Sequence, residues 1–122
     1  MDVVGIGNDI IEIDRIKKAI ERNKNFKYKV YTDKEIKYAE KSKFPYNIYA
    51  GRFAAKEAIS KAFGTGVRGF LLTDIEILNN ELGKPDVILK NEIKKKYEET
   101  EIMVTISHSK ENAIAMALIQ KR

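Results

Sequence analysis

The segment over residues 53–66, FAAKEAISKAFGTG, constrains the fold more than any other, because its pattern predicts a helix with one apolar stripe and polar residues at the margin of that stripe. We expect this helix over residues 46–63, with apolar residues returning every three or four positions. Its apolar stripe consists of Ile48, Ala55, Ile59, Ala62 and Phe63. Glu57 and Lys61 lie at the margin of this stripe, and the alanines beside them are small enough to leave room for a ligand.

Glu57, Lys61 and Gly64 follow one another at spacings of four and three, so they share one face of the predicted helix. A carboxylate that binds a metal ion, one turn before a lysine that binds phosphate, would fit this arrangement. An exposed Glu57–Lys61 ion pair, worth ~0.3–0.5 kcal/mol, is the simpler interpretation of this segment taken alone. Gly64 also has a structural explanation, since glycine ends a helix readily in the left-handed conformation.

A further candidate site residue, Asp9, ends the segment VVGIGND, which begins with a short apolar run near the amino end. The run predicts a strand over residues 2–10, and Gly5 and Gly7 within it allow another backbone to approach closely. The isoleucines that follow have helical spacing and predict a helix over residues 12–22. Asp9 therefore lies where strand gives way to helix, either as a ligand of a metal or phosphate site or as an acid that complements a helix dipole.

The rest of the chain alternates short helices with hairpins, so we expect the α+β class, with a small antiparallel sheet and one long central helix. A capping-box pattern over residues 32–35 predicts a helix that ends near residue 43. The remaining predicted elements are strands over residues 70–78 and 86–90, a helix over residues 91–99, and a hairpin over residues 102–107 and 112–119. Ile114, Met116 and Leu118 lie on one side of that hairpin, where they suit either an interface or ordinary core.

Composition limits the class of protein. A chain of 122 residues with 43% hydrophobic content and no flexible linker is expected to form one domain over residues 1–122. It has no cysteine and no run near ~20 apolar residues, so we expect a cytoplasmic protein without disulfides, thiolate metal sites or membrane spans. The net charge of +5 and the pI of about 9.3 favour an acidic partner or a polyanionic substrate. No nucleic-acid motif accompanies the scattered basic residues, so we expect no nucleic acid; a small basic RNA-binding module without catalysis stays the alternative.

Two other patterns do not predict function. The GxGxxG spelled by Gly64, Gly66 and Gly69 follows a predicted helix rather than a strand, so it does not indicate a dinucleotide site. Ser107 and His108 are adjacent in a predicted strand, where neighbouring side chains point to opposite faces. Because GxSxG is absent and the chain has one histidine, a Ser–His hydrolase is not supported either.

Several motifs occur together along the chain. The pattern GIGxDxxxxxRI is present as Gly5, Ile6, Gly7, Asp9, Arg15 and Ile16. The pattern FxxKEAxxKAxGTG is present as Phe53, Lys56, Glu57, Ala58, Lys61, Ala62, Gly64, Thr65 and Gly66. A GKP turn and an SHxxxxAxA segment are present as Gly83, Lys84, Pro85, Ser107, His108, Ala113 and Ala115. Together they resemble the holo-acyl-carrier-protein synthases, the small group of 4′-phosphopantetheinyl transferases, over nearly the whole chain.

This resemblance implies an activity. Enzymes of this family transfer the phosphopantetheine arm of coenzyme A to a serine of apo acyl carrier protein, release adenosine 3′,5′-bisphosphate and serve fatty acid biosynthesis. By resemblance, Asp9 and Glu57 are the metal ligands, and together with Lys61 they are the catalytic residues. Magnesium fits them because it prefers hard oxygen ligands and accepts one or two carboxylates. The acceptor of the serine proton stays open between a metal-bound water and Glu57 acting through one.

The resemblance also implies binding residues and partners. Coenzyme A is expected to contact Arg52, Lys61, Gly64 and His108, although Arg52 could also be a surface arginine that covers apolar area. His108 is expected to contact a phosphate or to form a structural hydrogen bond rather than to act as a base. An acidic acyl carrier protein is expected to dock on the basic face around Arg15. A homotrimer with each site at a subunit boundary is further implied, and hydrolysis of another pyrophosphate on the same metal site is a third possible function.

Overall fold

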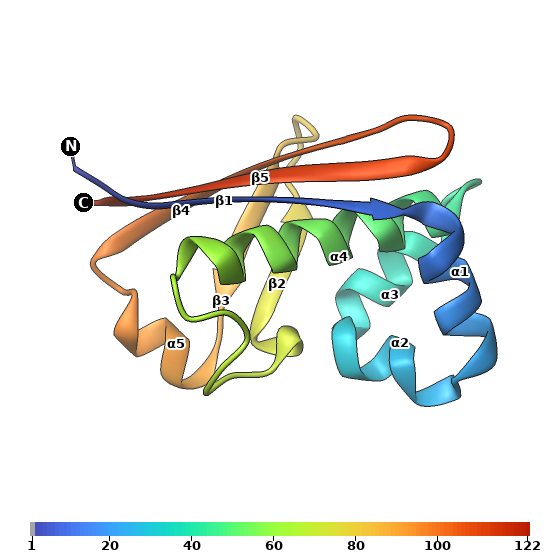
Figure 1. Cartoon of the computed structure of the whole chain (residues 1–122), viewed down its shortest axis with the longest axis horizontal. Coiled ribbons are helices and arrows are strands. Elements are labelled where there is room, and N and C mark those ends of the chain that lie inside the picture. Colours follow the sequence, from blue (N-terminus) through green and yellow to red (C-terminus); the bar gives the residue numbers. More distant parts are fainter. Residues whose placement is uncertain (1) are drawn as a thin grey trace.

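The structure, a computed structural model, describes residues 2–122 and places an antiparallel sheet over one side of a long helix (Figure 1). The strands of this sheet lie in the order β1 (Val3–Glu12), β5 (Asn112–Lys121) and β4 (Thr100–His108), and the helix is α4 (Pro45–Ala62). Because β1 and β5 run antiparallel, the two ends of the chain lie side by side. The predicted α+β fold, with a small antiparallel sheet and one long central helix, is confirmed.

The remaining elements surround α4. Three short helices, α1 (Ile13–Arg22), α2 (Lys24–Val30) and α3 (Asp33–Glu40), gather at the end where α4 begins (Figure 1). A second sheet consists of β2 (Ile75–Asn79) and β3 (Pro85–Leu89); the 3₁₀ turn η1 (Leu72–Asp74) precedes it and α5 (Asn91–Lys96) follows it. This second sheet contacts α3 through β2 and contacts β4 through β3. It therefore joins the helical end of the molecule to the edge of the main sheet.

Most predicted elements lie close to their observed positions. The elements predicted over residues 2–10, 12–22 and 46–63 correspond to β1, α1 and α4, within two residues at each end. Residues 24–30 form α2, which the sequence did not predict, because a helix of seven residues contains too few apolar positions to show a helical period. Its start is marked only by Asn23, whose side-chain oxygen accepts a hydrogen bond from the backbone N–H of Asn25 at 2.9 Å.

The strand predicted over residues 70–78 begins later than expected. Asp74 accepts a hydrogen bond from the backbone N–H of Leu71 at 3.0 Å, and this local contact closes η1 in place of strand pairing. Pairing with β3 then starts at Ile75. The helices predicted to reach residues 43 and 99 end at Glu40 and Lys96.

β1 lies directly against the backbone of α4. A methyl group at Gly7 would lie 2.0 Å from the carbonyl oxygen of Ala58, and one at Gly5 would lie 2.1 Å from that of Ala62. Both distances are far below van der Waals contact, so only glycine permits this approach. The alanines on this side of α4 are buried, which removes the other obstacle to close packing. The next inward residue of β1 is Asp9, and the contact brings it to the surface of α4.

The main sheet has a buried face and an exposed apolar face. Ala113, Ala115, Ala117 and Ile119 of β5 point toward α4 and are at most 1% exposed. We use the term outer apolar face for the opposite side, formed by Val4, Ile6, Ile10, Ile114 and Met116, which are 47–63% exposed. The predicted hairpin therefore supplies core on one side and exposed apolar surface on the other. In the described part of the chain, residues 2–122, no helix combines the length and apolar content needed to cross a membrane.

Candidate active site

Asp9, Glu57 and Lys61 come together where β1 lies against α4. The Lys61 ammonium is 3.0 Å from Oδ1 of Asp9, and the Lys61 side chain is 54% exposed while that of Asp9 is 16% exposed. Lys61 thus pairs with an acid on another element rather than with Glu57 one turn before it, and the surface ion pair considered above is not what forms. β1 continues to Glu12 before α1 begins, so Asp9 is too far from that helix to act as its N-terminal acid.

The two carboxylates of this group affect each other. Partial burial, and next the negative charge of Asp9, raise the pKa of Glu57, while the charge of Lys61 lowers it. A positive charge beside Glu57, in addition to that of Lys61, would therefore favour its ionised form. Among residues 2–122, no group of three or more His, Cys, Asp or Glu side chains could enclose a metal ion. Two partly exposed carboxylates are instead a ligand set that magnesium accepts when water and substrate oxygens complete its coordination.

A second group of polar side chains lines a separate cavity of about 250 Å³. We call it the arginine cavity; its polar lining residues are Tyr38, Asn47, Arg52, Asn79, Thr105 and His108. Arg52 is only 6% exposed, so the interpretation of Arg52 as a surface arginine is wrong. Its Nη2 donates to Oδ1 of Asn79 at 3.0 Å, and its guanidinium carbon lies 5.3 Å from the centre of the Tyr38 ring. The Nε of Arg52 is buried and has no hydrogen-bond partner.

Two further predicted residues, His108 and Gly64, have clear positions in the fold. His108 is the last residue of β4, pairs with Ala113 and borders the arginine cavity, whereas Ser107 pairs with Ile114 of the outer apolar face. Adjacent residues of a strand face opposite ways, so Ser107 and His108 do not form a catalytic dyad. Gly64 follows α4 with φ at +82°, as expected for the residue that ends the helix, and a side chain there would meet no atom within 4 Å.

The predicted site residues therefore divide into two groups on different sides of α4. Asp9, Glu57 and Lys61 form one group, which we call the carboxylate group, and they do not line the arginine cavity. Arg52 and Glu57 are five positions apart, which corresponds to a rotation of roughly 140° about the helix axis and a rise of about 7.5 Å. A ligand that contacts both groups within a single copy would have to pass around α4.

Sequence reasoning missed two features of this region. Tyr38 and Asn79 hold the Arg52 guanidinium, and Lys56 forms an ion pair with Glu35 in which both side chains are 0% exposed. A signal for the buried cations was present, since Arg52 and Lys56 are one turn apart in a helical segment that is otherwise small and apolar on that side. Their partners gave no such signal, because they are far away in the sequence.

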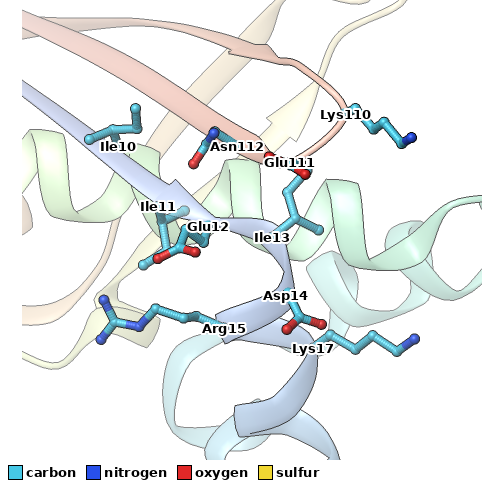
Figure 2. Close-up of a pocket in the computed structure, with 10 residues that line it drawn as sticks. All are labelled: Ile10, Ile11, Glu12, Ile13, Asp14, Arg15, Lys17, Lys110, Glu111 and Asn112. Atoms are coloured by element: carbon cyan, nitrogen blue, oxygen red, sulfur yellow. The ribbon is translucent and has the colours of Figure 1, made fainter.

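Arg15 lies at a third place, an open depression of about 900 Å³ formed by the end of β1, the start of α1 and the β4–β5 turn (Figure 2). Basic and acidic side chains both line it, namely Arg15, Lys17, Lys110, Glu12, Asp14 and Glu111. In Figure 2, Arg15 and Lys17 extend from α1 in opposite directions. Asp14 is engaged by Lys18 at 2.8 Å, so part of the acidic charge on α1 is already neutralised.

A profile of the 4′-phosphopantetheinyl transferase superfamily matches residues 5–117. The chain is 54% identical over 121 residues to a holo-[acyl-carrier-protein] synthase of Clostridium tetani, with 97% of this chain and 96% of the relative covered.

Solved structures agree with the sequence relatives. A holo-(acyl-carrier-protein) synthase from Bacillus anthracis, described as a complex with CoA (3′,5′-ADP), has a TM-score of 0.84 and 39% identity over 98% of both chains. A holo-[acyl-carrier-protein] synthase from Neisseria meningitidis has a TM-score of 0.91 and 31% identity, covering 98% of this chain and all of the other. These similarities confirm the resemblance drawn from the motifs: the chain belongs to the 4′-phosphopantetheinyl transferase superfamily.

Proposed function

We propose that this chain transfers the 4′-phosphopantetheine arm of coenzyme A to a serine hydroxyl of an acidic apo acyl carrier protein and releases adenosine 3′,5′-bisphosphate. The observation that carries the proposal is the meeting of Asp9 and Glu57, from two distant motifs, beside the Lys61 ammonium. The names of the relatives and the coenzyme A complex of the Bacillus anthracis protein support the two substrates. We place the reaction in the cytoplasm, which a chain without cysteine fits.

Asp9 and Glu57 would hold a magnesium ion. Their carboxylates supply hard oxygen ligands, and the raised pKa of Glu57 indicates that the pair gains from a nearby cation. When bound, magnesium would neutralise negative charge on the diphosphate of coenzyme A. This charge increases as the bond between the transferred phosphorus and the bridging oxygen of the diphosphate breaks. The residues themselves act by position, because phosphoryl transfer depends chiefly on orientation and on charge stabilisation.

Cationic side chains would hold the anionic parts of coenzyme A. Lys61 is half exposed, so its ammonium can turn from Asp9 toward a phosphate oxygen without losing a buried contact. Arg52 lines the arginine cavity with a largely buried guanidinium, and burial strengthens a hydrogen bond that this group donates to an anion. His108 borders the same cavity and would donate from its ring. Gly64 leaves open space after α4, where a ligand can approach the backbone.

We further propose a homotrimer in which each site draws on two copies. One support is the outer apolar face, since an exposed apolar surface of this kind commonly marks an interface. The other support is the separation of the carboxylate group from the arginine cavity by α4. If copies associate in a ring, the carboxylate group of one copy can lie beside the arginine cavity of the next, and one coenzyme A can contact both.

Arg15 is our proposed contact for the carrier protein. Its side chain is exposed at the open depression, and the outward side of α1 also carries Lys17, Lys18 and Arg22. An acidic partner would be attracted by this surface and by the net charge of +5. The depression also contains acids, so we expect a local contact at Arg15 to matter more than the overall charge of the pocket.

The first prediction concerns the reaction. Incubation with magnesium, coenzyme A and apo acyl carrier protein should increase the mass of the carrier by one phosphopantetheine arm, as measured by mass spectrometry. Asp9→Ala should reduce the rate by roughly 10²–10³-fold, the usual effect of removing one charge-stabilising group. Hydrolysis of coenzyme A with an unmodified carrier would replace the proposal with pyrophosphate hydrolysis, and RNA binding with neither reaction would favour the basic binding module.

The second prediction concerns the metal ligands and uses stability as the readout. Because the folded pKa of Glu57 is raised, its ionisation weakens the fold as the pH rises through that pKa. Glu57→Gln should therefore increase the metal-free melting temperature at pH 7 but not at a pH where Glu57 is protonated. Added magnesium should stabilise the wild type, since it binds only the folded state, and should have little effect on the variant.

Asp14→Asn is the control variant, and its melting temperature is measured by calorimetry in the same way as that of Glu57→Gln. Lys18 lowers the pKa of Asp14, so loss of that carboxylate should not stabilise the protein at pH 7. Equal stabilisation of wild type and Glu57→Gln by magnesium would remove Glu57 from the metal site.

The third prediction concerns sites shared between copies. With coenzyme A below saturation, Asp9→Ala and Arg52→Ala should each lose most of the wild-type rate alone, yet an equal mixture refolded together should recover about a quarter of it. The quarter arises because half of the carboxylate groups and, independently, half of the arginine cavities are intact in a mixed ring. Asp9→Ala mixed with Glu57→Ala is the control and should recover nothing, because both changes affect the same group. No recovery in the first mixture would indicate sites built within one copy.

The fourth prediction concerns docking. Arg15→Glu should raise the KM for the carrier protein about tenfold, the effect of losing one charge-assisted contact, and leave the KM for coenzyme A unchanged. Lys95→Glu, on the exposed surface of α5, changes the net charge equally and should have a small effect. Equal increases for both variants would assign the effect to net charge, and equal increases in both KM values for Arg15→Glu would exclude a docking role.

A further inference from the structure

The Lys56–Glu35 ion pair and its hydrogen bonds connect five elements inside the core, namely α2, α3, α4, η1 and β2. Nζ of Lys56 lies 2.7 Å from Oε1 of Glu35 and also donates to the backbone oxygens of Val30 at 2.5 Å and Leu72 at 3.1 Å. The other carboxylate oxygen of Glu35 accepts the backbone N–H of Ile77 at 2.9 Å. Every donor of the ammonium is used, and one carboxylate joins α4 to the free edge of β2. We call this set of contacts the inner rung.

A second set of contacts joins α4, β2 and α3, which the inner rung also connects. Arg52 of α4 donates to the side-chain oxygen of Asn79 of β2, and the side-chain nitrogen of Asn79 donates to the hydroxyl of Tyr38 of α3 at 2.9 Å. The Arg52 guanidinium also lies over the Tyr38 ring. We call this set the outer rung. It forms one wall of the arginine cavity.

The two rungs are adjacent on each element. Arg52 and Lys56 are one turn apart on α4, and Glu35 and Tyr38 are one turn apart on α3. On β2, the Ile77 and Asn79 positions are two residues apart, so they share one side of the strand. The inner rung therefore fixes the distances between α3, α4 and β2, and these distances also determine how the side chains of the outer rung meet.

Stability alone does not account for the inner rung. Two fully buried charges lose their hydration, and a well-packed apolar pair of similar size commonly serves a core equally well. A buried ion pair does fix relative positions, because its hydrogen bonds are directional and costly to leave unmade. The ion pair chiefly fixes the position of β2 relative to α4, because side chains at these two rungs join the two elements.

We propose that Lys56 and Glu35 are positioning residues that hold Arg52 in the geometry needed to bind an anionic group of coenzyme A. The inner rung keeps β2 and α3 at a fixed distance from α4, so Asn79 and Tyr38 can orient the guanidinium where Arg52 lines the arginine cavity. The carboxylate group lies on another side of α4 and makes no contact with the rung. This inference rests on the proposed function, because it takes coenzyme A as the ligand of the arginine cavity.

The test combines Lys56→Met with Glu35→Gln. This pair of changes removes both buried charges and leaves an amide oxygen to accept the Ile77 N–H. Calorimetric titration with coenzyme A and magnesium should show binding weakened about tenfold, which corresponds to one charge-assisted hydrogen bond. The KM for coenzyme A should rise by a similar factor, while kcat and the KM for the carrier protein stay near wild-type values.

Ile75→Val is the matched control, since Ile75 is fully buried on the same strand but belongs to neither rung. It should lower the melting temperature without altering coenzyme A binding. If the double variant bound coenzyme A as tightly as the wild type, or if Ile75→Val weakened coenzyme A binding equally, the ion pair would only stabilise the fold and would not position Arg52. Should the double variant not fold, Glu35→Gln alone is titrated with the same criteria. A wild-type protein that neither binds coenzyme A nor modifies the carrier would overturn the proposed function instead.

Discussion

The contact between the backbones of β1 and α4 is the constraint on which the rest of the site depends. Gly5 and Gly7 have no side chain, and the carbonyl oxygens of Ala58 and Ala62 occupy the space that a methyl group would need. A side chain at either glycine would push the strand away by the width of an atom. Asp9 would move with the strand, and the proposed magnesium site of Asp9 and Glu57 would tolerate little change in the separation of its carboxylates. The glycines of the first motif and the alanines of the second are thus two sides of one contact.

α4 carries different chemistry on its two polar sides because its surroundings differ. The side toward β1 is open at its margin, so Glu57 and Lys61 remain in contact with solvent and can exchange partners when a substrate arrives. The side toward α3 and β2 is enclosed, so Arg52 and Lys56 are fixed by hydrogen bonds before any ligand binds. An exposed lysine and a buried arginine suit different tasks, since a mobile ammonium can follow a reacting phosphate and a fixed guanidinium can select a static one.

The sequence predicted the parts of this site that depend on local pattern. Helical periodicity located Glu57 and Lys61 on α4, and two glycines with an apolar run located Asp9 on β1. The motif resemblance then brought these segments together, which periodicity cannot do. Burial of Arg52 was not predictable, because it depends on Asn79 and Tyr38, whose positions follow from how β2 and α3 pack. For the same reason, the sequence did not predict Glu35 as the partner of Lys56. The short elements α2 and η1 were not predicted because contacts of only one or two side chains define each of them.

Oligomer formation and activity would be linked in the proposed trimer. A sheet whose exposed face is as apolar as this one gains stability from association, because apolar area is removed from water. If that association also brings an arginine cavity to each carboxylate group, the energy of the interface and the geometry of the site come from the same contact. A separated copy would then keep its fold and its carboxylate group but lack the arginine cavity of a neighbour. Its activity would therefore depend on protein concentration even where its helices and strands are intact.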